Sequence, residues 1–351
     1  MQKNNYSQFA SPINTKSFGL LPDGKEVFCY TLTNKNGMEL AVINYGATIT
    51  SIKAPNANQE KIDVVLGFDT LQAYVDSFNL PNAPYFGAVV GRYAGRINEG
   101  SFILNGKTIQ LHKNHGKHHL HGGNDGLSKQ FWSLKNRSEG ESPSITLQYI
   151  SKNEEENYPG ILTVEVTYLL TENNQVVVEY HAHATEDTIL NVTQHSYFNL
   201  EGHQNSIEKQ SLLVNAAKVL ETDTLNIPTG NLLHTANCPF DFTEQKKCPT
   251  SIDTTFVIDQ KAKIAASLFS DKTKINMKVA TNQPAVHIYV GGNCFGMIKG
   301  KENAAYHTKS GICFETQNFP DAPNHAHFPS AVLKKGERYH HQTIFAFETI
   351  K

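Results

Sequence analysis

Short runs in which apolar and polar residues alternate recur along the whole chain and limit its possible folds more than any other feature. Five such runs, rich in β-branched and aromatic residues, span 39–52, 144–150, 161–170, 175–183 and 285–290. A period of two residues is typical of β-strands that bury one face. Turn signals such as Asp23-Gly24, Asn36-Gly37 and Asn105-Gly106 separate such runs. We therefore expect an all-β fold.

Helical periodicity is nearly absent, and the segment 66–78 is the one place where we expect a short helix. Closely spaced strands without an internal repeat favour a large antiparallel β-sandwich over a barrel or a propeller. The 351 residues, 39% of them hydrophobic, are enough for one domain with a substantial core. We expect a single domain over 1–351, with roughly the first 25 residues as a peripheral extension.

Charge and cysteine content point to a protein that handles small neutral ligands. Lys and Arg total 31 against 33 Asp and Glu, which argues against nucleic-acid or membrane partners. The polar N-terminus lacks a signal peptide, so we expect a cytoplasmic protein unless a leader has been removed. Five cysteines without a CxxC pair indicate free thiols, although Cys238 and Cys248 could bridge a loop.

A lone carboxylate, Glu315, stands inside the apolar, strand-like run GICFETQ. Alternation places Glu315 on one face of this strand with Cys313 and Gln317. A half-buried carboxylate is costly unless it is paired or used in chemistry. The run therefore predicts that Glu315 has a polar partner elsewhere in the chain.

The best candidate partner is His195, in the run NVTQHSYFNLEG. A lone histidine is more often a hydrogen-bonded core residue than a catalyst. Here the alternation groups His195 with Tyr197 and Asn199 on one face. A row of polar side chains is unfavourable on a strand face that packs in a hydrophobic core, so this row favours a functional role. A carboxylate and a histidine on different strands fit general acid–base chemistry on a polyol. Glu315 and Asp253 together would instead fit a glycosidase.

Two irregular segments, 91–100 and 237–256, are candidate ligand-facing loops or edges. The first holds Arg92 and Arg96, which offer planar donors to hydroxyls, although one of them could be structural. The second ends near Asp253, a weak signal by itself.

Five histidines fall within ten residues of LHKNHGKHHLHGG, namely His112, His115, His118, His119 and His121. Their spacing matches no defined zinc site, so a solvated loop is expected for most of them, and a metal site is the weaker alternative. His121 differs because Gly122-Gly123 follows it, where a ligand could approach the backbone closely.

Eight runs in a fixed order resemble the aldose 1-epimerase, or galactose mutarotase, family. They are NYGATITSI (44–52), DVVLGFD (63–69), YFGAVVGRYAGRI (85–97), LHGG (120–123), YPGILTVEVTY (158–168), HSYFNL (195–200), IPTG (227–230) and ETQNFPDAPN (315–324). The resemblance implies a galactose mutarotase-like supersandwich with an open sugar-binding cleft and no cofactor or metal. It also implies interconversion of the α and β anomers of free hexoses such as galactose and glucose, by a monomer or homodimer.

Carried over residue by residue, the resemblance implies a catalytic base at Glu315 and a catalytic acid at His195. The implied substrate-binding residues are Arg96, His121, Tyr197, Asp253 and His287. In the implied reaction Glu315 takes the proton of the anomeric hydroxyl while His195 protonates the ring oxygen, which opens the ring.

This chain departs from the family pattern at several positions near the implied site. His118 stands where many members have asparagine, Gly126-Leu127-Ser128 replaces a usual GFD, and Thr254 follows Asp253 where histidine is usual. His287 stands where relatives have glutamine or an aromatic residue. Three alternatives stay open: a sugar-binding protein without turnover, an epimerase of hexose 6-phosphates, which needs extra basic residues at the cleft, and a metal-dependent enzyme.

Overall fold

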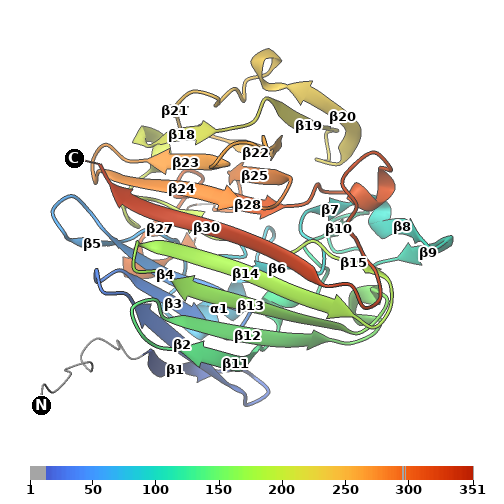
Figure 1. Ribbon diagram of the computed structural model, residues 1–351, viewed down its shortest axis with the longest axis horizontal. Coiled ribbons are helices and arrows are strands. Elements are labelled where there is room, and N and C mark those ends of the chain that lie inside the picture. Colours follow the sequence, from blue (N-terminus) through green and yellow to red (C-terminus); the bar gives the residue numbers. More distant parts are fainter. Residues whose placement is uncertain (1–12, 295, 297, 351) are drawn as a thin grey trace, which may run out of the picture.

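Antiparallel β-sheets dominate the computed structural model, which describes residues 13–294, 296 and 298–350 (Figure 1). A five-stranded sheet contains β1 (Asn14–Leu20), β2 (Glu26–Thr33), β3 (Glu39–Ile43), β4 (Thr48–Pro55) and β5 (Lys61–Asp63). A nine-stranded sheet contains, in spatial order, β11 (Ser133–Ser138), β12 (Ser144–Ser151), β13 (Leu162–Leu170), β14 (Gln175–Ala184), β30 (Tyr339–Thr349), β24 (Ile275–Thr281), β23 (Ala266–Phe269), β18 (Ser211–Val214) and β21 (Lys246–Lys247). A six-stranded sheet contains β17 (Tyr197–Phe198), β28 (Ile312–Gln317), β25 (Ala285–Val290), β22 (Ile252–Val257), β19 (Lys218–Thr222) and β20 (Pro228–His234).

Smaller elements connect these sheets. The strand pairs are β7 (Arg96–Ile97) with β10 (His119–Leu120), β6 (Val89–Val90) with β16 (Thr193–Gln194), β8 (Ser101–Leu104) with β9 (Lys107–Gln110), β15 (Thr188–Ile189) with β29 (Val332–Leu333), and β26 (Ile298–Lys299) with β27 (Ala305–Tyr306). Short 3₁₀ turns occupy Asn98–Gly100, Leu127–Lys129, Glu155–Asn157, Ile207–Lys209, Thr235–Asn237, Lys301–Asn303 and Ala322–Asn324. The prediction of an all-β antiparallel fold is confirmed.

Four of the five predicted strands coincide with β12, β13, β14 and β25 to within two residues. The prediction of one run over 39–52 is wrong, because a turn divides it into β3 and β4. Gly46, in this turn, has a φ of +64°, and a Cβ there would lie 2.4 Å from the carbonyl oxygen of Ser128. Only glycine fits both the backbone conformation and the close approach.

The helix expected within 66–78 is α1 (Leu71–Ser77), the only α-helix among the described residues. It begins after Thr70, whose hydroxyl accepts a hydrogen bond from the backbone N–H of Ala73 at 3.3 Å. This N-cap satisfies one of the free amides at the start of the helix. Leu71 and Tyr74 bury its inner face.

A continuous hydrophobic core joins the three large sheets, because each contributes one apolar face. Alternate residues of β13 are fully buried, and the intervening ones lie on the outer, half-exposed face. The rings of Phe198 on β17 and Phe345 on β30 lie 5.0 Å apart between the six-stranded and nine-stranded sheets. In Figure 1 the nine-stranded sheet crosses the front of the molecule, with β12, β13, β14 and β30 side by side.

The six-stranded sheet carries polar groups on the face opposite this main core. Glu315 on β28 lies directly opposite His287 on β25, and His287 lies opposite Thr255 on β22. Asp253 of β22 similarly pairs with Tyr289 of β25. Because directly paired residues point to the same side of a sheet, the register gathers these side chains on one surface.

The chain termini and cysteines add three observations. Of the stretch expected as a peripheral extension, residues 1–12 lie outside the described residues, while β1 forms the edge of the five-stranded sheet. The five cysteines, all of them described, are free, so the possible bridge between Cys238 and Cys248 is absent. In the part of the chain that the structure describes, no helix is long and apolar enough to cross a bilayer.

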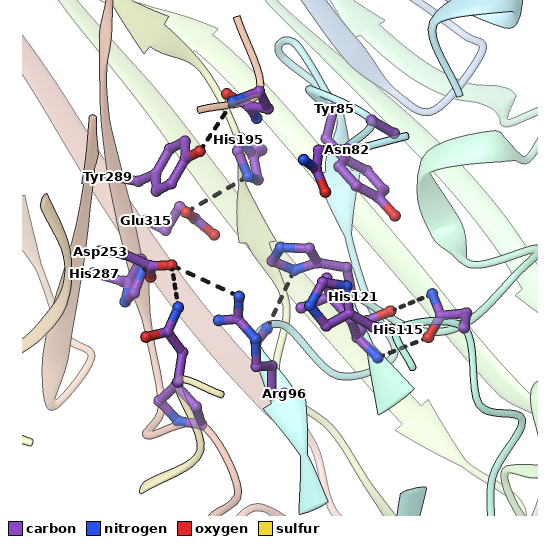
Figure 2. Close-up of a pocket in the computed structure, with 18 of the residues that line it drawn as sticks. Asn82, Tyr85, Arg96, His115, His121, His195, Asp253, His287, Tyr289 and Glu315 are labelled. Carbon is purple, nitrogen blue, oxygen red and sulfur yellow. Dashed lines mark hydrogen bonds and ion pairs between the residues drawn. The ribbon is translucent and has the colours of Figure 1, made fainter. Parts of the chain in front are cut away.

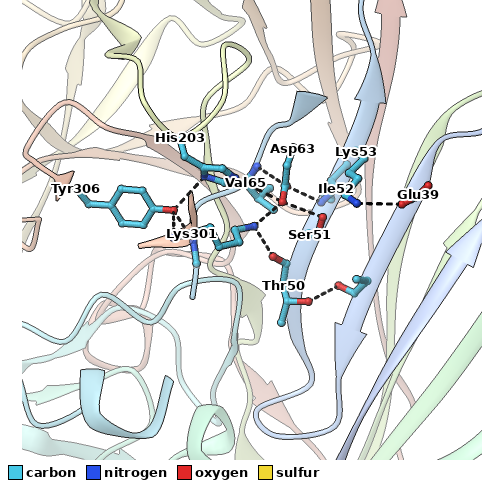
Figure 3. A network of polar contacts seen from close by, with 12 residues as sticks. Glu39, Thr50, Ser51, Ile52, Lys53, Asp63, Val65, His203, Lys301 and Tyr306 are labelled. Carbon is cyan, nitrogen blue, oxygen red and sulfur yellow. Dashed lines mark hydrogen bonds and ion pairs between the residues drawn. The ribbon is translucent and has the colours of Figure 1, made fainter. Parts of the chain in front are cut away.

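A buried ion pair ties the five-stranded sheet to the turn between β26 and β27 (Figure 3). Lys301 Nζ lies 2.7 Å from Asp63 Oδ2 and donates to the carbonyl of Thr50 at 2.6 Å. His203 Nε2 lies 3.5 Å from the same carboxylate, and its Nδ1 contacts the hydroxyl of Tyr306 at 3.0 Å. Burial would raise the pKa of Asp63, but the Lys301 and His203 charges and bonds lower it to about 2.

We expect Asp63→Asn to lower the free energy of unfolding by about 3–5 kcal/mol, because it leaves the Lys301 charge buried without its partner. In the wild type, the contribution of Asp63 is present above the ordinary carboxyl pKa of 3.8 and is lost as the pH falls toward about 2. Urea denaturation at pH 7 checks the first statement, and repeating it at decreasing pH checks the second.

The matched control is Glu172→Gln, which breaks the exposed Lys35–Glu172 pair and should have little effect. Equal losses in the two variants would contradict a special role for the buried pair.

Candidate active site

The polar face of the six-stranded sheet forms the floor of a cleft with a volume of about 360 Å³ (Figure 2). Six of the seven site residues expected from the sequence line this cleft: Arg96, His121, His195, Asp253, His287 and Glu315. Tyr197, expected to bind substrate, is not among the lining side chains. It is 1% exposed and packs behind His195, with ring centroids 5.3 Å apart.

Glu315 and His195 meet at the bottom of the cleft. His195 Nε2 lies 3.6 Å from Glu315 Oε1, and the two side chains are 5% and 3% exposed. This separation is an ion-pair distance but is too long for a direct hydrogen bond. Nε2 of His195 and Oε1 of Glu315 therefore remain available to hydrogen-bond a ligand in the cleft. The other ring nitrogen of His195 contacts the Sγ of Cys313 at 3.7 Å, and burial raises the pKa of this thiol well above its usual value.

Three aromatic neighbours hold the imidazole of His195 in place. The rings of Tyr197 and Tyr85 stack with it, at centroid distances of 5.3 Å and 5.8 Å. His121 meets it edge-on, with ring centroids 5.4 Å apart. A ring packed among three aromatic neighbours has little rotational freedom, so Nε2 stays directed at the cleft.

His121 is neutral and presents a single donor to the cleft. Its Nδ1 accepts a hydrogen bond from the backbone N–H of Gly95 at 3.2 Å, so the ring proton belongs on Nε2. Burial, together with the charge of His195, lowers the pKa of His121 well below its usual value. The backbone of His121 is left-handed, with a φ of +53°.

The glycine pair after His121 has a packing role that differs from the expected one. A Cβ on Gly122 would lie 1.7 Å from the carbonyl oxygen of Gly91, and one on Gly123 would lie 2.1 Å from Glu156. These glycines therefore allow two chain segments to touch, which orients His121.

Asp253 is the centre of a second polar cluster, on the opposite side of the cleft from His121 in Figure 2. Its carboxylate lies 2.9 Å from His287 Nε2 and 3.6 Å from Arg96, and it accepts a hydrogen bond from Asn226 at 2.9 Å. The prediction that Asp253 belongs to a ligand-facing loop or edge is wrong, because its alternating run IDTTFV forms the interior strand β22.

Asp253 and His287 shift each other's pKa in opposite directions. Burial would raise the pKa of Asp253, but the bond from His287 and the charges of His287 and Arg96 lower it to about 2. Burial would likewise lower the pKa of His287, yet its bond to Asp253 and the nearby carboxylates raise it above 6.5. Thr255 contacts the other ring nitrogen of His287 at 2.8 Å.

The two arginines of segment 91–100 have different roles. Arg96 lines the cleft, whereas Arg92 is 2% exposed and lies outside it. The guanidinium of Arg92 donates to Ser151 Oγ and to four backbone carbonyls, so it is a structural residue. Its partners are carbonyls and a hydroxyl rather than the acidic side chain considered from the sequence.

The polar row expected around His195 is likewise only partly functional. Asn199 lies outside the cleft lining and donates hydrogen bonds to the carbonyls of Asn205 and Ser310. It therefore holds two neighbouring chain segments together.

The histidine-rich segment is not a solvated loop throughout. His115 and His121 line the cleft, and His118 and His119 are 3% and 0% exposed. His119 contacts the hydroxyl of Tyr158 at 2.6 Å, and only His112 conforms to the expectation of a half-exposed side chain. Histidine spacing alone could not reveal this burial, because the rings of His118 and His119 contact Glu99 and Tyr158, which are distant in sequence.

Sequence reasoning missed several lining residues. Tyr289 shares the alternation of His287 on β25, a signal that could have been used. Tyr85 and Asn226 come from turns, where both have positive φ values, and no periodicity marks them. Their functional positions follow from contacts between segments that are distant in sequence.

The ligand atoms of His121, His195 and Glu315 all lie within 4.8 Å of one another. Two imidazoles and a carboxylate are ligands that zinc accepts. Because His121 Nδ1 is engaged by Gly95, only its Nε2 would be available to an ion. The expectation of a metal-free site therefore stays a prediction and needs a direct test.

Comparisons with known proteins identify the same family that the eight sequence runs resemble. A family model described as Aldose 1-epimerase matches residues 29–346. The galactose mutarotase of Bos taurus is 36% identical over 341 residues, covering 94% of this chain and 97% of that protein. The aldose 1-epimerase of Haemophilus influenzae is 34% identical over 343 residues, covering 93% and 97% respectively.

Solved structures lead to the same family. A GalM/aldose epimerase homologue from C. elegans superimposes with a TM-score of 0.85 at 28% identity, covering 92% of this chain and 99% of that one. A galactose 1-epimerase from Lactobacillus acidophilus gives a TM-score of 0.84 at 26% identity, covering 97% and 99%. With the family model matching most of its length, this chain belongs to the aldose 1-epimerase family.

Proposed function

We propose that this protein is an aldose 1-epimerase that interconverts the α and β anomers of free hexoses such as galactose and glucose. The observation that carries the proposal is the pair of Glu315 and His195, 3.6 Å apart on the floor of a polar cleft. Full-length relatives named galactose mutarotase and aldose 1-epimerase support it.

The reaction needs one base and one acid that act on neighbouring oxygens of the sugar. Glu315 takes the proton of the hydroxyl on C1, and the electron pair left on that oxygen forms the carbonyl as the bond from C1 to the ring oxygen breaks. Protonated His195 gives the proton of Nε2 to the ring oxygen, which becomes a hydroxyl. Rotation about the C1–C2 bond and reversal of both transfers close the ring as the other anomer.

The two histidines have different roles in this reaction. His195 Nε2, 3.6 Å from Glu315 Oε1, is placed to give the proton. His121, whose pKa is well below its usual value, is neutral, so it hydrogen-bonds the ring oxygen through Nε2 without supplying the proton. Arg96, Asp253 and His287 bind the hydroxyls farther along the sugar.

We expect Glu315→Gln and His195→Asn each to lower kcat by at least about 10²-fold, because each removes one of the two proton-transfer groups. Optical rotation of freshly dissolved α-D-galactose and α-D-glucose measures the rate above the spontaneous one. Calorimetric sugar binding by both variants would separate lost chemistry from lost binding.

The matched controls are Glu179→Gln on β14 and His340→Asn on β30, both on the outer face of the nine-stranded sheet. These should keep wild-type rates. A wild type that binds sugar without accelerating mutarotation would make the protein a sugar-binding member of the family.

We expect the KM for galactose to rise as the pH increases past the raised pKa of His287, because deprotonation removes the positive charge beside Asp253. The imidazolium is present below this pKa and lost above it, so the change belongs on the alkaline side of 6.5. KM values measured from about pH 6 to 9, a range that covers the alkaline side of histidine titration, give the profile. In His287→Gln this alkaline rise should be absent, and a profile identical to that of the wild type would contradict the assignment.

We expect the enzyme to keep its activity after EDTA treatment and dialysis, because the proposed proton transfers need only side chains. Activity that disappears with the chelator and returns with added Zn²⁺ would instead assign the His121, His195 and Glu315 cluster to a metal.

A further inference from the structure

Three polar side chains on the outer face of the nine-stranded sheet take no part in the catalytic cleft. They are Glu179 and His181 of β14 and His340 of β30, with side chains that are 31%, 54% and 47% exposed. In Figure 1 these two strands lie side by side in the middle of the sheet. The inner face of the same strands packs in the main hydrophobic core, which separates the three residues from the cleft. We call them the outer-face triad.

The strand register brings the members of the outer-face triad together. His181 pairs directly with His340 across the two strands, and Glu179 lies two residues before His181. Directly paired residues, and residues two apart on one strand, project from the same face of a sheet. The two imidazole rings stack with centroids 5.0 Å apart and an interplanar angle of 20°. The contact between the two histidines is thus a consequence of the sheet itself.

Both imidazoles direct Nε2 at the carboxylate of Glu179. Nε2 of His340 lies 2.9 Å from Oε1, and Nε2 of His181 lies 3.7 Å from Oε2. One ligand atom from each of the three residues lies within 4.8 Å of the other two. Ligand atoms that bind one zinc ion at about 2.0–2.2 Å are about 3–3.5 Å apart, so shifts of roughly 1 Å in these exposed side chains complete the geometry.

The carboxylate of Glu179 has no lysine or arginine partner among the described residues. Its contacts are the two histidines and the side-chain amide of Gln342, which donates to Oε1 at 3.3 Å. The neighbouring Glu165, opposite His181 on β13, is instead paired with Lys135. An ordinary histidine is largely neutral at pH 7, so a carboxylate among imidazoles keeps its charge for an incoming cation. The amide of Gln342 orients this carboxylate, as hydrogen-bond partners of metal ligands do.

Two imidazoles and one carboxylate make a ligand set that selects among cations. Imidazole nitrogen suits Zn²⁺, Cu²⁺ and Ni²⁺, whereas Mg²⁺ and Ca²⁺ prefer oxygen ligands. Three protein ligands also leave a position on the ion for water. The ligands stand on interior strands that pair without a break in register over 175–182 and 339–346. Such a support holds the ligands in place before an ion binds.

We propose that the outer-face triad is a binding site for a divalent transition-metal ion, and that Zn²⁺ is the ion its ligand set fits. The bound ion joins β14 to β30 and takes no part in the reaction in the cleft. The inference is independent of the proposed function, because none of the three residues lines the cleft. Loss of the metal site therefore leaves mutarotation intact, and loss of mutarotation leaves the metal site intact.

The test is calorimetric titration of Zn²⁺ into the full chain, without a histidine tag, after EDTA treatment and dialysis. We expect saturable binding with a Kd below about 0.1 mM, since three ligands converge on one point. Mg²⁺ is the control ion, because a ligand set with two imidazoles disfavours it. The absence of saturable Zn²⁺ binding would overturn the proposal, and so would a Kd for Mg²⁺ equal to or below that for Zn²⁺.

Three variants locate the ion. Glu179→Gln, His181→Asn and His340→Asn should each raise the Kd for Zn²⁺ by at least about 10-fold, because each removes one ligand. The controls are His234→Asn, at an exposed position of β20, and Glu315→Gln, in the other cluster with metal-ligand spacing. Both controls should keep a Zn²⁺ site with the wild-type Kd. Binding that is lost in Glu315→Gln but kept in the three test variants would place the ion in the cleft and refute the proposal.

Thermal unfolding gives a second readout, which reports whether the ion bridges the two strands. An ion held by β14 and β30 together binds only the folded protein, so saturating Zn²⁺ should raise the Tm of the wild type and of His234→Asn. The Tm of His181→Asn and His340→Asn without metal should stay close to that of the wild type, because both side chains are about half exposed. Zn²⁺ should no longer raise it in these two variants. An equal rise in the wild type and in both variants would contradict the bridge.

Discussion

The cross-strand register of β22, β25 and β28 is the constraint on which both the core and the cleft depend. Each strand alternates between the two faces, so the same six residues of β28 supply Phe314 to the core and Glu315 to the cleft. A slip of one residue would reverse both faces, exposing the apolar row and burying the carboxylates among apolar side chains. The large hydrophobic core therefore also determines the geometry of the chemistry.

Charge pairing explains how such a sheet tolerates carboxylates at its centre. Glu315 lies beside His195, and Asp253 lies among His287, Arg96 and Asn226. Without these partners the burial of either anion would be strongly unfavourable. Some polar atoms of the cleft nevertheless make no hydrogen bond within the described chain, including Gln317 Oε1 and Asn293 Oδ1. Such unpaired atoms lower the free energy of unfolding of the protein without ligand. A polyol that hydrogen-bonds them would bind more tightly than a ligand that cannot.

The sequence predicts those features of the structure that depend on neighbouring residues better than those that depend on contacts between distant parts of the chain. Alternation within one strand identified β12, β13, β14 and β25 and placed Glu315 on a polar face. It failed where the signal lies in contacts between distant segments. The turn at Gly46 is required by the carbonyl of Ser128, and the buried rings of His118 and His119 contact Glu99 and Tyr158, which are distant in sequence.

The candidate site shows the same division. Motif order pointed to six side chains that the structure gathers in one cleft, but Tyr197 and Asn199 share the local pattern of His195 and still lie outside the cleft lining. Tyr197 pairs with Cys313 of β28 and packs against the ring of His195, so it lies on the Glu315 side of the sheet but is covered, whereas Asn199 lies beyond the end of β17. Alternation beyond a strand end carries no information about which face a side chain occupies.

The rim of the cleft is built from turns, whereas its floor is built from interior strands. Residues 80–83, 114–115 and 226 border the cavity from segments outside the three large sheets, while Glu315 and Asp253 belong to β28 and β22. Exchanging a rim side chain disturbs neither the strand register nor the main core. Substrate range and thermodynamic stability are thus governed by different sets of residues, and evolution or laboratory selection can alter the first while leaving the second intact.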